Sequence, residues 1–384
     1  MFDKEFLIFG SPAIGEEEIA EVEAVMRSGW LGTGPRVAQF EEDFAIYQGL
    51  GVQQVAAVNS CTAALHVSMV AANLEPGSEV ITTPLTFCAT VNAAIHAGLN
   101  PVMADIDPTS HNIDPIAIEA AITSKTRAII PVHFAGRACD MQAIMAIAKK
   151  HQLTVIEDCA HAIETTFHGK KAGTFGDFGC YSFYSTKNVV TGEGGMITGR
   201  NAELIARAKV LALHGMSKDA WHRFGDKGYK HYQVIEAGFK YNMMDLQAAI
   251  GLHQLRRVEA NWQRRAQIWN YYQQALADFP INRPAAIESN TRHAYHLYTI
   301  GIDEKQTGIS RDAFLDAMNQ RKIGTGVHYL ALTEHPYYQQ RYGWRPEQTP
   351  YATQVGRSTV SLPISAKLTD SDVERIVDAI KKLL

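Results

Sequence analysis

The stretch FGCYSFYSTKNVVTGEGGM, residues 178–196, combines an apolar strand pattern, a lysine and a glycine-rich loop. Its aromatic and small residues suit a half-buried strand, and residues 191–195 then break the pattern with glycines. We expect the strand to end at Lys187, which places this amine at the edge of a sheet in largely apolar surroundings. Desolvation lowers the pKa of a lysine and leaves part of it as the neutral nucleophile that Schiff-base formation requires. A surface lysine just after a strand is the alternative that this stretch leaves open.

Short apolar segments alternate with amphipathic segments in the first half of the chain. The apolar segments have the length and composition of strands, and the segments between them have helical spacing. Such alternation predicts βαβ units, a mostly parallel sheet and helices on both of its faces. Ligands of such sheets gather at the carboxyl ends of the strands. We expect strands over residues 55–58, 79–82, 101–105, 128–132 and 154–157, and helices near residues 63–72, 90–97, 115–122 and 141–150.

Three loops that follow these strands carry residues suited to ligand binding. Cys61 and Thr62 open a helix whose free N–H groups suit a phosphate, although an ordinary helix cap is the simpler explanation. Phe87 is either a core residue or a platform on which a ring stacks. Asp158 ends an apolar strand, where a carboxylate needs a cation, a metal or an N–H partner.

The remaining segments extend this α/β pattern. We expect helices over residues 16–28, 37–47, 202–213, 244–277, 311–320 and 370–383, and strands near residues 295–302 and 326–328. The long helical region divides the chain into a large domain, residues 1–245, and a smaller α+β domain, residues 246–384. The polar and aromatic segment 214–242 is typical of a ligand-binding loop, with a solvated loop as the alternative. Trp30, in a glycine-rich turn, either covers a ligand or packs.

The composition argues against several classes of protein. A net charge of −4 gives no basic field for nucleic acid. Five cysteines without a C-x-x-C pair predict neither a disulfide framework nor a zinc site and suit a reducing cytoplasm. We expect no export signal and no membrane span. The dinucleotide, P-loop and zinc-protease motifs do not occur, and Cys159 with His161 is better explained by packing and hydrogen bonding than by a metal.

The residues singled out so far suit the cofactor pyridoxal 5′-phosphate (PLP). Lys187 would form the Schiff base, Asp158 would keep the pyridine nitrogen protonated, and the helix that starts at Cys61 would bind the phosphate. Six ordered motifs also resemble the DegT/DnrJ/EryC1/StrS family of nucleotide-sugar aminotransferases, most closely its UDP-4-amino-4-deoxy-L-arabinose-type branch. They are GWLGTGP (29–35), VHFAG (132–136), IEDCAHA (156–162), SFYSTKN (182–188) with GEGG (192–195), GFKYN (238–242) and GTGVHY (324–329). The resemblance implies the aspartate-aminotransferase architecture, PLP-dependent fold type I, and a homodimer with active sites at the subunit interface.

Carried over position by position, the resemblance implies a role for each residue of the site. Lys187 corresponds to the lysine that binds the cofactor, Asp158 to the partner of the pyridine nitrogen and Phe87 to the stacking aromatic. His161 lies near the phenolic oxygen, where many relatives have glutamine. The phosphate contacts are Cys61, Thr62 and Ser182, with Asn242 reaching over from the other subunit. The substrate contacts are Trp30, Tyr184, Lys240, Tyr241, His328 and Tyr329, and Tyr184 replaces a histidine of the arabinose-type enzyme.

The implied reaction is a ping-pong transamination. L-glutamate gives its amino group to the cofactor, which becomes pyridoxamine 5′-phosphate, and the group then passes to a keto carbon, most closely C4, of a UDP-linked sugar for a surface polysaccharide or lipid A. Lys187 would transfer the proton between the Cα atom of the amino acid and the C4′ atom of the cofactor. The alternatives are a C3-specific aminotransferase on a UDP-3-keto-hexosamine or dTDP sugar, a sugar dehydratase, which has histidine in place of this lysine, and a non-catalytic regulator. We expect a cytoplasmic protein without nucleic-acid or membrane partners.

Overall fold

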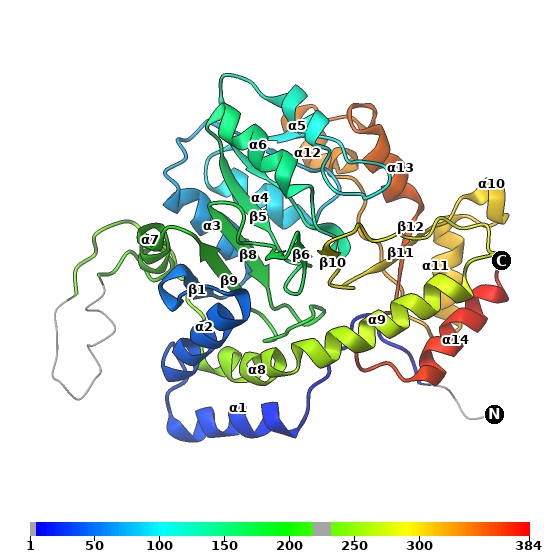
Figure 1. Cartoon of the computed structure of the whole chain (residues 1–384), viewed down its shortest axis with the longest axis horizontal. Helices are drawn as coiled ribbons and strands as arrows, with labels where there is room; N and C mark the ends of the chain where they lie inside the picture. Colours follow the sequence, from blue (N-terminus) through cyan, green and yellow to red (C-terminus); the bar gives the residue numbers. More distant parts are fainter. Residues whose placement is uncertain (1–4, 218–231) are drawn as a thin grey trace.

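A seven-stranded sheet forms the centre of the computed structural model, which describes residues 5–217 and 232–384 (Figure 1). Its strand order is β1-β9-β8-β5-β4-β2-β3. Neighbouring strands from β8 to β3 run parallel, as the alternating pattern predicts, whereas β9 is antiparallel to both β8 and β1. The strands are β1 (Val55–Val58), β2 (Glu79–Thr82), β3 (Asn100–Met103), β4 (Thr126–Ile130), β5 (Thr154–Asp158), β8 (Phe178–Ser182) and β9 (Gly195–Gly199).

Two features of the stretch 178–196 differ from the prediction. Strand β8 ends at Ser182, so Lys187 lies in the turn that follows the strand and not at its end. The glycine run does not only break the strand, because Gly195 already begins β9, which the sequence did not predict. The chain reverses between the two strands, and Ser182 pairs with Gly195. This hairpin places Lys187 on the loop that connects two central strands.

Helices cover both faces of the sheet because successive strand residues point to opposite sides. Val80 and Ile130 belong to the core cluster with α3, α4 and α7, whereas Ile81 and Ile129 belong to the cluster with α5 and α6. The five helices confirm the predicted ones within two residues at each end. They are α3 (Cys61–Ala71), α4 (Cys88–His96), α5 (Pro115–Ala121), α6 (Met141–His151) and α7 (Ala202–Ala212).

The N-terminal helices pack beside the sheet together with a helix from much later in the chain. Helix α1 (Glu16–Ser28) ends at Gly29, whose φ of 74° is accessible to glycine at little cost. Helices α2 (Pro35–Gln48) and α8 (Asp245–Arg256) share a core cluster in which Phe40 and Phe44 of α2 meet residues of α8. Figure 1 shows α8 lying between α1 and α2.

A second core forms around the C-terminal residues. Helix α9 (Val258–Ala275), α11 (Arg311–Gln320) and α14 (Asp370–Lys381) pack on a two-stranded antiparallel sheet of β11 (Tyr298–Gly301) and β12 (Thr359–Leu362). The strand expected near residues 326–328 is absent from the described residues, where Gly326 makes only an isolated bridge to Ser361. Because α8 packs into the N-terminal core while α9 enters the C-terminal one, the division at residue 245 stays a prediction.

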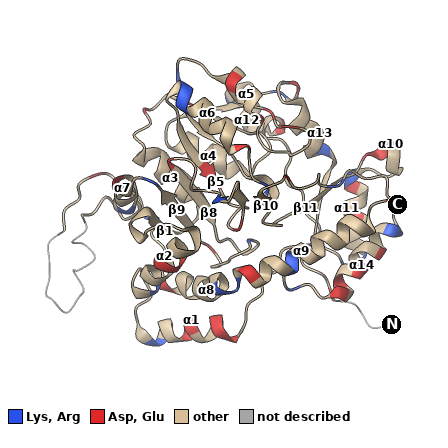
Figure 2. Cartoon of the chain, in the orientation of Figure 1, with Lys and Arg blue, Asp and Glu red and all other residues tan. Residues whose placement is uncertain are grey.

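Several small elements were not predicted. A three-stranded sheet has the order β10-β6-β7. These elements are β6 (Thr166–Phe167), β7 (Lys170–Lys171), β10 (Thr291–Arg292), α10 (Glu304–Thr307), α12 (Pro336–Tyr342) and α13 (Pro350–Ser358). Basic and acidic side chains are interspersed over the helices (Figure 2), in keeping with the net charge of −4. Within residues 5–217 and 232–384, none of the helices has the length and apolar character that crossing a membrane requires.

Candidate active site

A cavity of about 630 Å³ opens at the carboxyl ends of the central strands. For each of four strands, the last residue or the residues that follow it line this cavity. Ligands of mostly parallel sheets bind at this end of the strands. The predicted residues that line it are Cys61 and Thr62 after β1, Phe87 after β2, Asp158 at the end of β5, His161 beyond it, Ser182 at the end of β8, Tyr184 and Lys187 in the following turn, and His328 with Tyr329.

Asp158 is the buried carboxylate of the cavity. Its Oδ2 accepts a hydrogen bond from the hydroxyl of Thr90 (2.8 Å), and its Oδ1 accepts one from the backbone N–H of Ala160 (3.1 Å). Burial raises the pKa of this carboxyl group, and the two hydrogen bonds act in the opposite direction. A cationic N–H in the cavity would stabilise the ionised carboxylate, which fits a protonated ring nitrogen.

Lys187 is the amine of the same cavity. Burial lowers the pKa of this lysine to about 8, although Cys61 and Asp158 act in the opposite direction. At neutral pH about a tenth of such a lysine is neutral, compared with well under a thousandth of an ordinary lysine. The expected partly desolvated amine is therefore present, though in the turn after the strand. Its backbone N–H donates to the carbonyl of Tyr184 (2.8 Å) and so fixes the turn.

The N-terminus of α3 faces the cavity with Cys61 and Thr62. Ser60 caps the helix by accepting a hydrogen bond from the N–H of Ala63 (3.1 Å), so the helix has the ordinary N-terminal cap that was the simpler explanation of this segment. The first N–H groups of a helix still have no intrahelical partner and can bind an anion. Gly195 of β9 permits this arrangement, because a Cβ at that position would lie 2.5 Å from the backbone of Ser60. The sequence analysis had given this glycine only the role of breaking a strand.

Aromatic and histidine side chains form the other walls. Phe87 directly precedes α4 and leaves 59 % of its surface exposed, which suits a platform for a ring better than a core residue. The Nδ1 atom of His161 accepts from the N–H of Ala135 (3.2 Å), so the neutral ring carries its hydrogen on Nε2, which lies 3.1 Å from the hydroxyl of Tyr329. Burial, with a contribution from Lys187, holds the pKa of His161 well below its usual value, and the ring is therefore neutral.

His328 and Tyr184 complete the set that this chain gathers in the cavity. The Nδ1 atom of His328 lies 2.8 Å from the hydroxyl of Ser361, and burial lowers the pKa of this histidine to about 4. The side chain of Tyr184 is exposed at the rim. Both positions are accessible to a second ligand that enters above a bound ring.

Four predicted residues lie outside the lining of this cavity. Trp30 donates through its indole N–H to the carbonyl of Thr33 (2.9 Å). Asn242 donates to the hydroxyl of Thr33 (2.6 Å) and accepts from Lys240 (2.7 Å). The fourth residue, Tyr241, stacks on Phe239 with 5.1 Å between ring centroids. Residues 218–231, about half of the segment 214–242 that was expected to cover the ligand, lie outside the described residues.

A second group of functional side chains lies behind the strand end. His133, Glu157 and Cys159 bring ligand-type atoms within 4.8 Å of one another. Glu157 already accepts hydrogen bonds from three backbone N–H groups, those of Gly173, Phe175 and Gly176, and it lies 3.1 Å from His133. We interpret this group as a support for the loop 173–176 rather than as a metal site. Because strand residues alternate, Glu157 faces this support while Asp158 faces the cavity.

The cavity suits a flat ring that carries a phosphate at one end, a basic nitrogen at the other and a carbonyl group that can react with the amine of Lys187. PLP has this layout, and Asp158, Lys187, Phe87 and the start of α3 match its four parts. Together with the strand order of the central sheet, the cavity places the protein among the PLP-dependent transferases of fold type I.

The chain belongs to the DegT/DnrJ/EryC1/StrS aminotransferase family, whose family model matches residues 12–381. It is 46 % identical over 380 residues to the spore coat polysaccharide biosynthesis protein SpsC of Bacillus subtilis (strain 168), covering 99 % of this chain and 97 % of that protein. Its structure resembles a putative sugar aminotransferase from Streptococcus pneumoniae in the pyridoxamine phosphate form, with a TM-score of 0.90 and 30 % identity over 98 % of this chain and 97 % of the other. It also resembles the aminotransferase PseC of Helicobacter pylori, involved in the biosynthesis of pseudoaminic acid, with a TM-score of 0.90 and 28 % identity over 99 % of both chains.

These relationships confirm the predicted fold class, the enzyme class and the cofactor. The protein is an aminotransferase of the EC 2.6.1 type that uses PLP. When bound, PLP supplies an electron sink that stabilises negative charge on the carbon bearing the amino group.

Proposed function

We propose that the protein transfers the amino group of L-glutamate to the C4 keto carbon of a UDP-linked sugar, in the manner of the UDP-4-amino-4-deoxy-L-arabinose-type branch, for a surface polysaccharide or a lipid A sugar. The observation that carries the proposal is the placement of Lys187 and Asp158 in one cavity that also has room for a second ligand. Support for a polysaccharide role comes from the relative SpsC, and support for a nucleotide-sugar pathway comes from the likeness to the family of sugar aminotransferases.

Two residues of the cavity, Lys187 and Asp158, would perform the chemistry together with PLP. The Nζ atom of Lys187 would take the proton from the Cα atom of glutamate and return a proton on the way to product, for which a pKa of about 8 is suitable. The carboxylate of Asp158 would hold the proton on the ring nitrogen. Because Asp158 receives hydrogen bonds from Thr90 and Ala160, its carboxylate plane is fixed before the ligand arrives.

The other residues of the cavity would bind and orient. Phe87 would stack on the ring, and the start of α3 with Ser182 would hold the phosphate. Tyr184, His328 and Tyr329 would contact the sugar. The neutral rings of His161 and His328 leave the cavity without extra positive charge that would oppose protonation of Lys187.

We further propose a homodimer in which each protomer completes the cavity of its partner. Trp30, Lys240, Tyr241 and Asn242 have the side chains suited to a nucleotide and a phosphate, yet none of them lines the cavity of its own chain. Trp30 and Asn242 both contact Thr33, and Lys240 contacts Asn242, which groups these three residues on one surface. A second protomer that packs on that surface would receive these residues at its own cavity.

Absorption spectroscopy with defined substrates tests the proposed function. The purified protein loaded with PLP is mixed with L-glutamate and then with a panel of UDP- and dTDP-linked 4-keto and 3-keto sugars. We expect the band of the lysine-bound cofactor to bleach with glutamate and to return with a UDP-4-keto sugar. Return of the band with a 3-keto sugar alone would replace the C4 assignment by the C3-specific alternative. A Lys187→Ala protein with near-normal turnover would refute the role of this lysine.

A further inference from the structure

The residue after Lys187 is bound to three other parts of the chain. The amide Nδ2 of Asn188 donates to Glu164 Oε2 (2.9 Å) and to the carbonyl of Ala294 (3.1 Å), and its Oδ1 lies 3.0 Å from Nδ1 of His296. Since a carboxylate and a carbonyl only accept, the NH₂ group must face them and the Oδ1 atom must face His296. This side chain therefore uses both its donors and its acceptor.

A buried ion pair fixes one end of these contacts. Glu164 is fully buried, and its other oxygen, Oε1, accepts a hydrogen bond from Nη2 of Arg265 on α9. Arg265 leaves only 3 % of its surface exposed and also donates to the carbonyl of Ala294 (3.4 Å). A buried ion pair needs accurate geometry and further hydrogen bonds to offset the desolvation of its charges. Asn188 supplies one of these hydrogen bonds to Glu164.

The other end of these contacts reaches the cavity through two histidines. The ring of His296 lies 4.4 Å from the ring of His161, centroid to centroid, and His161 in turn reaches the hydroxyl of Tyr329. Burial, with a contribution from Lys187, holds the pKa of His296 well below its usual value. The neutral ring must then carry its hydrogen on Nδ1 to donate to Asn188. Hydrogen bonds thus fix His296 at Asn188, and the ring contact with His161 extends this support to the wall of the cavity.

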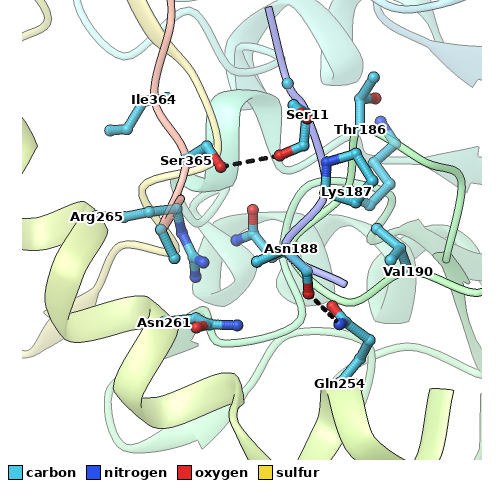
Figure 3. A pocket seen from close by; sticks show the side chains of 14 residues that line it. Ser11, Thr186, Lys187, Asn188, Val190, Gln254, Asn261, Arg265, Ile364 and Ser365 are labelled. Carbon is cyan, nitrogen blue, oxygen red and sulfur yellow. Dashed lines mark hydrogen bonds between the residues drawn. The ribbon is translucent and has the colours of Figure 1, made fainter. Parts of the chain in front are cut away.

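Figure 3 shows the small cavity of about 30 Å³ on the far side of this segment. Asn188 and Lys187 line it from the turn after β8, and Arg265 and Asn261 line it from α9. Gly10 lies against Thr186 beside this cavity, since a Cβ at Gly10 would be 3.1 Å from the Thr186 side chain. The hydrogen bonds of Asn188 act together with this contact to fix the position of the segment that carries the lysine.

We infer that Asn188 is a positioning residue, which holds Lys187 on one side and the pair His296 and His161 on the other, with the ion pair of Glu164 and Arg265 as its anchor. The inference rests on the proposed role of Lys187. Loss of the Asn188 amide removes the donor to Oε2 of Glu164 and the acceptor of His296, so both the lysine segment and the histidine wall are released together.

Asn188→Ala is the first variant, with Asn261→Ala as the matched control. Both asparagines line the same small cavity, but of the two only Asn188 makes hydrogen bonds to Glu164 and His296. We expect Asn188→Ala to weaken PLP binding by the apoprotein about tenfold and to diminish the visible circular dichroism of the bound cofactor. The pH at which an amine reagent labels Lys187 at half its maximal rate in the apoprotein should move upward from about 8. The control should change none of the three.

A pair of charge variants provides a rescue test that does not alter Asn188. Glu164→Gln alone leaves the charge of Arg265 unpaired, whereas Glu164→Gln with Arg265→Gln removes both buried charges and keeps an amide oxygen at residue 164 that can accept from Asn188. We expect the single variant to lose circular dichroism amplitude and the double variant to regain most of it. Equal effects of Asn188→Ala and Asn261→Ala, or a double variant worse than the single one, would overturn the inference.

The role of Lys187 is tested separately in the same assays. If Lys187→Ala retains the lysine-bound absorption band, the proposed function itself fails. If Lys187→Ala loses the band while Asn188→Ala and the Glu164 variants keep wild-type affinity, circular dichroism and labelling midpoint, only the inference about Asn188 fails.

Discussion

Replacing Thr90 by valine removes one of the two hydrogen bonds that Asp158 receives and leaves the shape of the side chain unchanged. Thr90 gives its single hydroxyl hydrogen to the carboxylate at 2.8 Å. The hydroxyl of Thr86, which lies 2.9 Å from that of Thr90, must then donate to Thr90. The substitution therefore removes the last link of a two-hydroxyl chain that ends on the carboxylate proposed to hold the ring nitrogen.

The expected magnitude follows from the charge of the acceptor. A hydrogen bond to an ionised group contributes roughly 1.5–3 kcal/mol, and one pKa unit corresponds to about 1.4 kcal/mol. Loss of the bond should therefore raise the pKa of Asp158 further and weaken its hold on a protonated ring by about tenfold. The remaining bond from Ala160 keeps the carboxylate partly stabilised, so binding should weaken and not disappear.

Titration of the apoprotein with PLP measures the affinity, and urea unfolding measures the stability. Thr82→Val is the matched control, because Thr82 is also buried and donates at 2.8 Å, but to the backbone carbonyl of Ile130. Thr82→Val should lose about 1 kcal/mol of unfolding free energy, and Thr90→Val roughly 1.5–3 kcal/mol because its acceptor is charged. Only Thr90→Val should lose affinity for PLP. Equal affinities of the two variants would refute the reasoning.

Four further substitutions or titrations test the site. Asp158→Asn should still bind the cofactor but slow turnover at least a hundredfold, measured with glutamate, because an amide cannot hold the ring proton. In the apoprotein, Lys187 should react with an amine reagent with a midpoint near pH 8, more slowly below it where the amine is protonated, as mass spectrometry of its peptide will show. Gly195→Ala should cost about 1–3 kcal/mol of stability and weaken binding of inorganic phosphate, since its Cβ would overlap the backbone of Ser60. In NMR titrations His328 should stay neutral down to about pH 5, because burial lowers its pKa to about 4.

Much of the central sheet follows from local pattern. Strands over residues 55–58 and 79–82 and the helix over residues 311–320 have the predicted bounds, because each is a short apolar run or an amphipathic run between clear stop signals. Strand β9 escaped prediction since its five residues begin and end with glycine and gain their stability from pairing with β1 and β8. Strand β12 pairs with β11, about sixty residues earlier in the chain, through contacts that no local window contains.

The candidate site divides in the same way. Asp158 and Phe87 could be predicted as site residues from their positions at or after the ends of strands. His161 and Tyr329 were predicted from the motif resemblance. The residues that hold them, such as Thr90, had no signal, because a threonine at a helix start is common and its bond to Asp158 joins residues 68 positions apart. Asn242, which the resemblance assigns to the site of the other subunit, lies outside the cavity of its own chain.

The sequence by itself determined that strands and helices alternate, that ligand-binding side chains follow the strands, and that the chain carries the motifs of its family. These properties are local, since they depend on residue type and on spacing within a few turns of chain. Tertiary structure decided how far Lys187 lies beyond its strand, which residues surround Asp158, and how Asn188 joins Glu164 to His296. Burial and long-range hydrogen bonds set the pKa values and donor directions at the site, and both arise only when distant segments pack together.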